Sequence, residues 1–572
     1  MKKQQNLFYL MAFFLSITVI YFLFLGTYPL LTPDESRYAE IAREMIETKQ
    51  YIVPHLNYVL YFEKPALFYW IIASALKCFG LHEWSVRFWT VIFAIGGCGL
   101  TYFAATRWYN RNTAFYATTL LATSFLYFIM GHMVALDLPV SIFLTATLIF
   151  FYIGIQPSHQ SNQKYYFWLS AVMAAYAVLT KGLIGIVFPL AIIGTWVLLL
   201  NQWRTLKHWP ITSSTLLFLI IALPWHIIMQ LRHPAFFNFY IIGEHFLRYS
   251  TLEAAHEEPF YFYLGILLIG FLPWSTFLPQ AIKAHWPTWK NRATYQTEIF
   301  LFAWIFIIFV FFSFSKSKLI PYILPIFPPL SILVGHYFAL QSSRKTTGIT
   351  IGFCVLPFFS FAFATYLILL PHYYDLMNPL VGTRFLYLLA VIFTLVTMIS
   401  LAVYWRLTIK AAFVSLSIGS MIFLLTLLLA IPSIDHNSIK SLAVTLKPLL
   451  TSQDEVINYK RYNQDLPFYL QRRVTLVDWF MNELEFGYHH QSNVTWMIDS
   501  QSFWKKFQGT KRIFIITRVT DLADMRRDHP QLTFYPIAQT QRNVLLSNQS
   551  VRCFRDTISL NQSIHSSNPM SC

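Results

Sequence analysis

The sequence predicts an all-α polytopic membrane protein that carries a small α/β domain at its C-terminal end. Of the 572 residues, 56% are apolar and only 12% are charged, and the mean hydropathy is +0.49. Soluble domains contain about 25% charged residues, so a chain built only of soluble cores is excluded. The five cysteines are too few and too scattered for a disulfide scaffold or a Cys-x-x-Cys metal site.

Apolar stretches that could cross a membrane recur through the first three quarters of the chain. About 20 apolar residues in a helix span a bilayer core, and about thirteen such stretches are predicted, with short or proline-marked stretches leaving the number open by one or two. They cover residues 7–26, 83–106, 113–131, 138–155, 165–180, 182–200, 211–230, 260–279, 298–314, 319–340, 348–370, 382–404 and 411–431.

Basic loops predict the orientation of these spans. With the N-terminus in the cytoplasm, every loop on the cytoplasmic side contains Lys or Arg. Of the 14 acidic residues before position 432, 13 lie on or beside the opposite face. Acidic residues contribute little to topology, so their position indicates a polar working surface there. The net charge of +16 therefore comes mostly from the basic loops that set the orientation of the spans, and it does not indicate nucleic-acid binding.

The tail, residues 432–572, has a different pattern and is predicted to lie on the outer side. Its 141 residues contain 16 Lys or Arg and 12 Asp or Glu. Short β-rich runs alternate with helical segments, which predicts an α/β domain after a membrane domain of residues 1–431. The strands are expected at 455–459, 473–479, 511–518, 531–537 and 542–547, and the helices at 465–471 and 521–528. Cys553 and Cys572 could pair if this end is in an oxidising compartment.

The outer loop of residues 27–82 contains the densest group of polar residues. Thr32 and Glu35 have the spacing of a capping box, and Pro33 suits the first position of a helix. An apolar stripe follows at Tyr38, Ile41, Ala42 and Met45. The pattern predicts an amphipathic helix on the membrane surface. An alternative interpretation is that Asp34 and Glu35 are only first-turn acids, which the helix dipole favours.

Six groups of charged residues are predicted to meet at this one face. A single charge at the end of a span is usually a snorkelling anchor, but several that converge indicate a site. Carboxylates beside cations suit an anionic group such as phosphate next to a sugar. The candidates are Asp34, Glu35 and Arg37; Glu63 and Lys64; Asp137; Lys181; His245 and Arg248; and Lys316 and Lys318.

Two further features bear on the chemistry. Glu63 and His245 are plausible ligands for zinc or magnesium, although two protein ligands make an incomplete site and a lone histidine is more often simply hydrogen-bonded. The sequence contains no nucleotide-binding P-loop, no GxGxxG and no GxSxG motif. An activated substrate is therefore expected to arrive through the membrane, carried by a lipid phosphate.

Three runs of residues carry a resemblance to a known family. Residues 33–45, 62–65 and 316–325 resemble the bacterial lipid A aminoarabinose transferases, which are GT-C glycosyltransferases related to the protein O-mannosyltransferases. The resemblance implies an enzyme of the bacterial inner membrane. It would move 4-amino-4-deoxy-L-arabinose from undecaprenyl phosphate to a lipid A phosphate at the periplasmic face. Ala66 and Pro321 depart from the pattern, where Pro and Thr are expected.

The resemblance also implies roles for individual residues. Asp34 and Asp137 match the catalytic aspartates, and Glu63 and His245 match metal ligands. The phosphate-binding positions are matched by Arg37, Lys64, Lys181 and Arg248, and Tyr322 matches a tyrosine near the donor.

An inverting transfer is the expected reaction, in which the acceptor oxygen attacks the anomeric carbon and the polyprenyl phosphate leaves. A lipid phosphate acceptor needs no general base, whereas a Ser or Thr acceptor would require Asp34 to take a proton. A transporter or lipid flippase is the non-enzymatic alternative. It is disfavoured because the charges lie at one edge of the spans and no internal repeat is visible.

Overall fold

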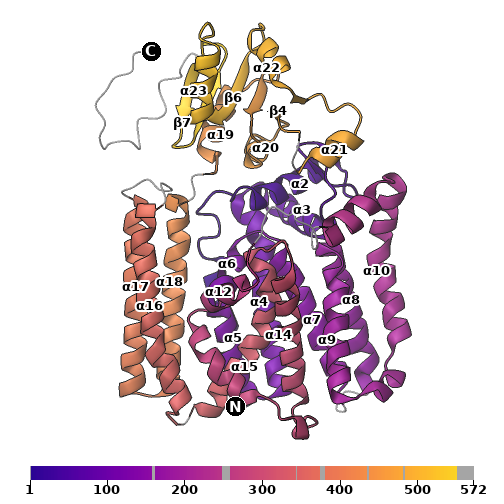
Figure 1. Ribbon diagram of the computed structural model, residues 1–572, viewed down its shortest axis with the longest axis vertical. Coiled ribbons are helices and arrows are strands. Elements are labelled where there is room, and N and C mark those ends of the chain that lie inside the picture. Colours follow the sequence, from indigo (N-terminus) through magenta and orange to yellow (C-terminus); the bar gives the residue numbers. More distant parts are fainter. Residues whose placement is uncertain are drawn as a thin grey trace. The chain divides into compact units, whose positions relative to one another are not determined.

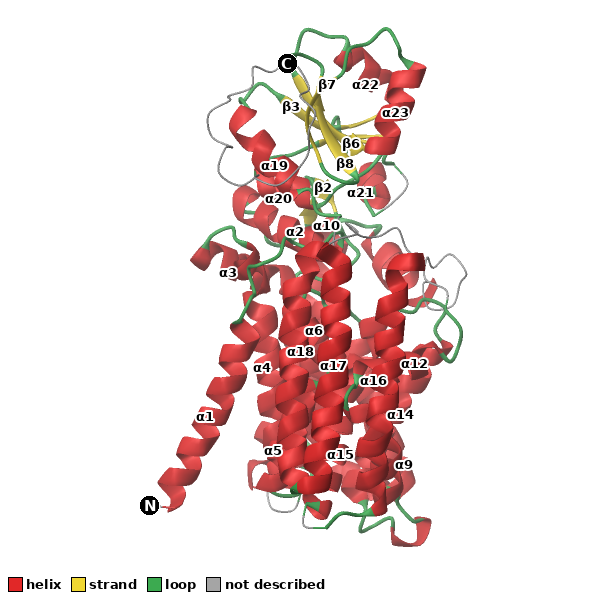
Figure 2. Ribbon diagram, turned by 90° about the vertical axis from the view of Figure 1, so that its left-hand side faces the viewer, coloured by secondary structure: helices red, strands yellow, loops and turns green. Residues whose placement is uncertain are grey.

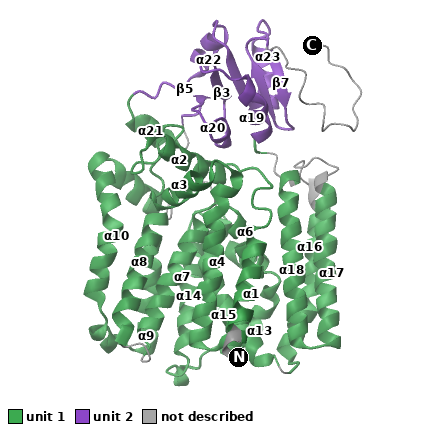
Figure 3. Cartoon of the chain, turned by 180° about the vertical axis from the view of Figure 1, so that it is seen from behind, with its two compact units in different colours: residues 1–438, 483–492 green, residues 439–482, 493–572 purple. Residues whose placement is uncertain are grey.

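The computed structural model describes residues 2–156, 161–247, 258–342, 344–373, 381–434, 437–480 and 483–550. These residues form two units, coloured separately in Figure 3. Unit 1 comprises Met1–Ser438 together with Glu483–Ser492, and unit 2 comprises Ile439–Asn482 and Asn493–Cys572. Unit 1 thus ends seven residues after the predicted boundary and also includes a short segment of the predicted C-terminal domain.

Unit 1 is helical, and each predicted span falls on a helix or on a bent pair of helices (Figure 1). Eight of the described helices are long and apolar enough to cross a membrane, or ten if each of two bent pairs forms one span. The predicted number of thirteen stays a prediction. The helices are α1 (Lys2–Phe22), α4 (Glu83–Trp108), α5 (Arg111–Thr123) bent by 63° into α6 (Phe125–His132), α7 (Asp137–Gly154), α8 (Gln163–Lys181), α9 (Ile184–Leu200), α10 (Ile211–Arg232), α12 (Phe262–Gly270) bent by 106° into η4 (Trp274–Phe277) and α13 (Leu278–His285), α14 (Gln296–Phe314), η6 (Ile320–Ile326) continuing into α15 (Phe327–Gln341), α16 (Thr347–Tyr373), α17 (Val381–Arg406) and α18 (Ile409–Ile434).

The loop after α1 contains α2 (Asp34–Thr48), α3 (Leu67–Phe79) and a hairpin of β1 (His55–Leu56) and β2 (Val59–Leu60). The apolar stripe of α2 is buried, but so are Glu40, Arg43 and Glu44 on other faces. Arg43 donates hydrogen bonds of 2.7 and 2.6 Å to Glu40. Neighbouring segments therefore cover more than the apolar stripe of α2, and its place on the membrane surface stays a prediction.

The start of α2 also differs from the predicted capping box. Pro33 occupies the N-cap position rather than the first helical position, and no side chain caps the helix. The Glu35 carboxylate accepts a hydrogen bond of 2.8 Å from the Leu31 N–H. It is held there by an ion pair with Arg87, so it does not bond back to Thr32 as a capping box requires.

The strands of unit 2, yellow in Figure 2, form a sheet. It has six strands in the order β5-β4-β3-β6-β8-β7. Strands β5, β4, β3 and β6 are parallel to one another, and β8 pairs antiparallel with both β6 and β7. The predicted strands and helices are all present, whereas α19, α22 and the short β5 were not predicted. The elements are α19 (Lys440–Leu446), β3 (Glu455–Tyr459), α20 (Asp465–Leu470), β4 (Thr475–Val477), β5 (Met497–Ile498), α22 (Ser500–Phe507), β6 (Ile513–Arg518), α23 (Val519–Asp528), β7 (Tyr535–Gln539) and β8 (Asn543–Ser547).

A buried carboxylate makes the stability of unit 2 dependent on pH. The Asp454 oxygens accept hydrogen bonds of 2.8 and 2.5 Å from Arg512 and one of 2.7 Å from the Thr451 N–H. Burial alone would raise the pKa of Asp454, but these hydrogen bonds outweigh it and lower the pKa to about 2. Because the unfolded value is about 3.9, the stabilisation is present above pH 4 and is lost as the pH falls towards 2.

We expect Asp454→Asn to lower the free energy of unfolding by about 1 kcal/mol at pH 7 and by almost nothing at pH 2. The expected loss is small because the Arg512 side chain is 29% exposed, so solvent screens its ion pair with Asp454. Denaturant titration at the two pH values measures the effect. Asp528→Asn is the control, because its partner Arg527 is 72% exposed. An equal loss at both pH values would contradict the expected linkage.

Candidate functional site

Asp137, Lys181 and Tyr322 form the first cluster of predicted residues. Asp137 is the first residue of α7, and Lys181 is the last residue of α8. The Lys181 ammonium contacts the Asp137 carboxylate, and its Nζ lies 4.4 Å from the centre of the Tyr322 ring. The Lys181 and Asp137 side chains are only 14% and 12% exposed, so solvent screens this pair less than a surface pair. The structure brings together three residues that lie far apart in the sequence.

Gly182 joins this cluster to the rest of the site. It follows α8 with a φ of 87°, a backbone conformation that favours glycine. A Cβ at this position would overlap the His245 imidazole and lie 2.6 Å from the Tyr240 hydroxyl. Both side chains belong to η3 (Phe237–Leu247), a π-helix. The missing side chain of Gly182 therefore allows η3 to lie directly against the end of α8.

Arg37 is surrounded by carboxylates. Its Nε lies 3.0 Å from Oε2 of Glu483, its Nη2 lies 3.5 Å from Oδ1 of Asp34, and its Nη1 lies 3.9 Å from Oε2 of Glu63. Burial opposes the charge of Arg37, but Tyr61 and the carboxylates of Glu483 and Glu63 outweigh it and raise the pKa of the guanidinium. Arg37 is thus a permanent cation in a largely buried acidic environment.

Lys64 has a similar environment. Its Nζ lies 2.6 Å from Oε2 of Glu244, a residue of η3, and donates a hydrogen bond of 2.8 Å to the carbonyl of Glu63. The Lys64 and Glu244 side chains are 18% and 16% exposed. Each of the cations Arg37, Lys64 and Lys181 therefore lies against a partly buried carboxylate.

Tyrosine hydroxyls lie between the charged groups. Burial and the negative charge of Asp34 raise the pKa of Tyr38, and Asp137 acts in the same direction, so both aspartates lie within electrostatic reach of this one hydroxyl. The hydroxyls of Tyr69 and Tyr240 are buried and have no hydrogen-bond partner within the described chain. A buried polar group without a partner is costly, so these two hydroxyls are suited to bind a polar ligand.

Glu35 holds the site together rather than binding substrate. It is fully buried, and its oxygens accept bonds of 3.0 and 2.6 Å from Arg87 and of 2.8 Å from each of the Leu31 and Val134 N–H groups. The predicted substrate-binding role is wrong, because these four donors occupy both oxygens. Val134 lies three residues before Asp137, so Glu35 connects the segments that contain the two predicted catalytic aspartates.

The predicted metal ligands Glu63 and His245 both have hydrogen-bond partners within the protein. The His245 Nδ1 lies 2.7 Å from the carbonyl of Tyr240, and its Nε2 accepts a bond of 3.2 Å from the Leu183 N–H. The Glu63 carboxylate accepts a bond of 2.8 Å from Tyr61. Among the residues that the structure describes, no group of three His, Cys, Asp or Glu could hold a metal ion. A zinc or magnesium ion at this site stays a prediction.

The remaining predicted residues differ in their surroundings. The buried Lys318 donates bonds of 2.8 and 2.6 Å to the carbonyls of Glu258 and Ser315, which supports a structural role in the turn before η6 rather than phosphate binding. Lys316 is exposed on the same turn, and its role stays a prediction. The predicted residues Arg248, Cys553 and Cys572 lie outside the described residues.

The site also contains residues that were not predicted from the sequence, among them Arg87, Tyr38, Tyr69, Tyr240, Glu244 and Glu483. Arg87 interrupts an apolar stretch near its start, and a buried charge of this kind requires a partner. Glu244 adjoins the predicted His245 and could have been identified by that position. Tyr38 was assigned to an apolar stripe, and nothing in the sequence near Glu483 indicates a contact with Arg37.

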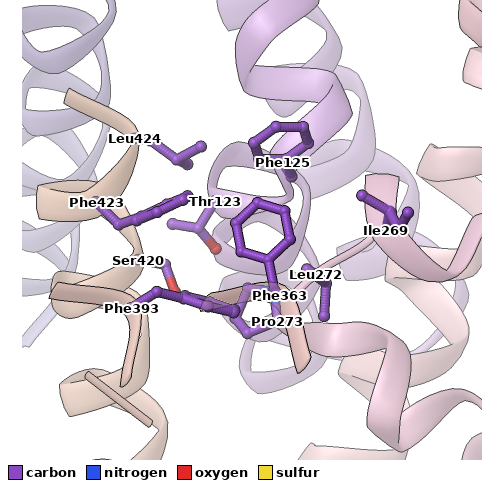
Figure 4. A pocket seen from close by; sticks show the side chains of 10 residues that line it. All are labelled: Thr123, Phe125, Ile269, Leu272, Pro273, Phe363, Phe393, Ser420, Phe423 and Leu424. Carbon is purple, nitrogen blue, oxygen red and sulfur yellow. The ribbon is translucent and has the colours of Figure 1, made fainter. Parts of the chain in front are cut away.

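Unit 1 also contains an apolar pocket near the break between α5 and α6, shown in Figure 4. Its two lining hydroxyls, Thr123 and Ser420, each donate to a carbonyl of their own helix. The lining residues are Thr123, Phe125, Ile269, Leu272, Pro273, Phe363, Phe393, Ser420, Phe423 and Leu424. None of the predicted site residues lines this pocket, and its lining suits only an apolar group.

Two parts of the chain match known protein families. Residues 63–228 match the dolichyl-phosphate-mannose-protein mannosyltransferase model. Residues 442–548 match the aminoarabinose transferase C-terminal domain model. The two matches lie on different parts of the chain, one on the membrane helices and one on the sheet.

Curated relatives carry one name, undecaprenyl phosphate-alpha-4-amino-4-deoxy-L-arabinose arabinosyl transferase. The protein of Enterobacter sp. (strain 638) is 32% identical over 351 residues, which are 60% of this chain and 62% of that protein. One of Proteus mirabilis (strain HI4320) is 36% identical over 336 residues, 58% of this chain and 60% of that protein. The chain thus aligns with about three fifths of the length of these relatives.

A solved structure shares the fold. ArnT from Cupriavidus metallidurans bound to undecaprenyl phosphate superimposes with a TM-score of 0.85 at 23% identity, over 94% of this chain and 98% of that one. Its apo structure gives a TM-score of 0.83. The predicted resemblance and the predicted fold class are confirmed by these matches.

Proposed function

We propose that this chain is an inverting glycosyltransferase that moves 4-amino-4-deoxy-L-arabinose from undecaprenyl phosphate to a phosphate of lipid A. The observation that carries the proposal is the set of three partly buried cations, Arg37, Lys64 and Lys181, each of which lies against a carboxylate. Asp34 and Asp137 are two of these carboxylates. The names of the curated relatives and the ligand of the Cupriavidus protein support this donor.

The reaction forms one bond and breaks one. An oxygen of the acceptor phosphate attacks the anomeric carbon of the sugar, and the bond from that carbon to the donor's phosphate oxygen breaks. The electron pair leaves with undecaprenyl phosphate, whose negative charge rises as it departs. Lys181 and Lys64 stabilise this developing charge, and preorganised electrostatics of this kind usually supply the largest part of the rate.

The aspartates act on the opposite charge. Positive charge develops at the anomeric carbon in the transition state, and the aminosugar carries an ammonium group. Asp34 is half exposed and Asp137 is partly buried, so both can face a sugar. Because the acceptor phosphate is already anionic, no general base is required.

The proposed location is the periplasmic face of the bacterial inner membrane. The basic loops predict that face, and the lipid-linked donor and the lipid acceptor are both in the membrane. Mass spectrometry of lipid A from cells with and without this chain tests the function. We expect aminoarabinose on lipid A only when the chain is present. Unchanged lipid A together with altered glycoproteins would contradict the proposal.

Protein O-mannosylation is a second candidate, favoured by the family match of residues 63–228. The two functions differ in their need for Asp34. A Ser or Thr acceptor must lose a proton in the transition state. Asp34→Asn should then lower the rate of transfer by a factor of about 10² to 10⁴. With a phosphate acceptor, the reaction requires no base, so we expect Asp34→Asn to retain measurable transfer. The pH dependence of the rate in the two proteins checks this. Transfer that persists in Asp34→Asn would contradict a hydroxyl acceptor, whereas loss of transfer is compatible with both acceptors.

A further inference from the structure

The segment Glu483–Ser492 interrupts the sheet unit in sequence but belongs to the helical unit. It contains the short helix α21 (Glu485–His490). The Gln491 side chain accepts a bond of 2.9 Å from the Leu60 N–H and donates one of 3.1 Å to the carbonyl of Tyr58. Gly487 lies so close to the Leu60 carbonyl that a Cβ would overlap it. The segment is therefore fitted to the β1–β2 hairpin at two points.

The same segment contacts both parts of the chain that form the Lys64–Glu244 ion pair: the loop that contains Lys64 and the helix η3 that contains Glu244. The Phe486 ring lies 5.3 Å from the ring of Phe62, which precedes Glu63 and Lys64. It also lies 4.1 Å from the ring of Phe239 in η3, the helix that contains Glu244. Aromatic contacts at these distances stabilise the packing beyond the area that they bury. Phe486 thus packs against the residues on both sides of the Lys64–Glu244 ion pair.

Glu483 begins the segment and faces Arg37. Of the three carboxylates around Arg37, that of Glu483 is the nearest, at 3.0 Å, and the two side chains are 15% and 12% exposed. A pair with so little exposure is weakly screened by salt. A phosphate that binds Arg37 must therefore replace this carboxylate or share the guanidinium with it.

We propose that Glu483–Ser492 is a working part of the substrate site, in which Glu483 is the internal counter-ion that the donor's phosphate displaces from Arg37. The inference rests on the proposed function, since it requires a lipid phosphate to bind there. Glu244 holds the same relation to Lys64. Both cations lie against carboxylates in this structure, so phosphate binding exchanges one anion for another.

The proposal predicts opposite effects for two substitutions in one segment. Glu483→Gln removes the competing charge, so undecaprenyl phosphate should bind about tenfold more tightly and with a steeper dependence on salt. Gln491→Ala removes both bonds to the hairpin and loosens the segments that hold Lys64, so binding should weaken by about fivefold. The controls are Glu485→Gln and His489→Ala, whose side chains are exposed on the same segment.

Titration of undecaprenyl phosphate into the purified full-length protein measures these affinities, with thermal unfolding to show that each variant is folded. If Glu483→Gln is the only variant that binds undecaprenyl phosphate more tightly, the proposal is supported, because a purely structural role of Glu483 predicts weaker binding. Weaker binding by Glu483→Gln, or binding equal to that of Glu485→Gln, would overturn it. If the wild-type protein binds no undecaprenyl phosphate, the proposed function itself fails. This result differs from weaker or unchanged binding by Glu483→Gln, which would overturn only the proposed role of Glu483.

Discussion

Replacing Lys181 with alanine should reduce the rate of sugar transfer by about two to three orders of magnitude. Its ammonium contacts Asp137 and lies 4.4 Å from the ring centre of Tyr322 in a site that is largely closed to solvent. The substitution removes a cation from the departing phosphate and leaves the Asp137 carboxylate without its ion-pair partner. The effect should fall mainly on kcat, because the leaving phosphate carries more negative charge in the transition state than in the bound donor.

Lys164→Ala is the matched control for this experiment. Lys164 lies at the opposite end of the same helix, where its ammonium contacts the ring of Trp168. We expect its activity to equal that of the wild-type protein. Rate measurements on the purified proteins with a lipid-linked sugar donor check both variants. A Lys181→Ala protein with normal kcat would remove Lys181 from the mechanism.

Replacing Arg87 with methionine should have the largest effect on stability, about 3–5 kcal/mol. Arg87 and Glu35 are both fully buried, and removing one partner leaves the other charge uncompensated. The guanidinium also donates bonds of 2.7 to 3.0 Å to the carbonyls of Leu25, Tyr28 and Pro29. The variant should therefore lose the conformation of the loop that leads into α2 and Asp34.

Thermal unfolding in detergent tests this expectation. The control is Arg107→Met in the last turn of the same helix, where the side chain is exposed, and its stability should be unchanged. Replacing Arg87 and Glu35 together by apolar residues should restore part of the stability, because no unpaired charge is then buried. A single Arg87→Met variant as stable as Arg107→Met would contradict this account of the loop.

Local patterns in the sequence predict most of the fold. The strand at residues 455–459 has the same bounds in the structure, because a short apolar run between polar turns marks a buried strand. Apolar runs also locate the membrane helices. The number of spans is less predictable, because α5 and α6 are separated by a bend of 63° at Ser124 and composition does not show such a bend.

The site could be predicted in part for the same reason. Asp137 and Lys181 can be predicted because ionisable groups at the end of an apolar run are costly without a function, whereas Tyr322 is predicted only through the family resemblance. Glu35 was misassigned, since its partner Arg87 is 52 residues away and the pair forms only in the folded chain. The Gln491 contact with Leu60 spans 431 residues, and no local pattern carries that information.

The most direct test of the proposed activity is transfer by the purified protein between two defined lipids. Wild-type protein and Asp137→Asn are incubated with undecaprenyl phosphate-linked aminoarabinose and lipid A, and the products are analysed by mass spectrometry and for anomeric configuration. We predict aminoarabinose on a lipid A phosphate, with inverted configuration, for the wild-type protein and severe loss for Asp137→Asn. Absence of transfer by the wild-type protein, or a product that retains the donor's configuration, would contradict the proposed reaction.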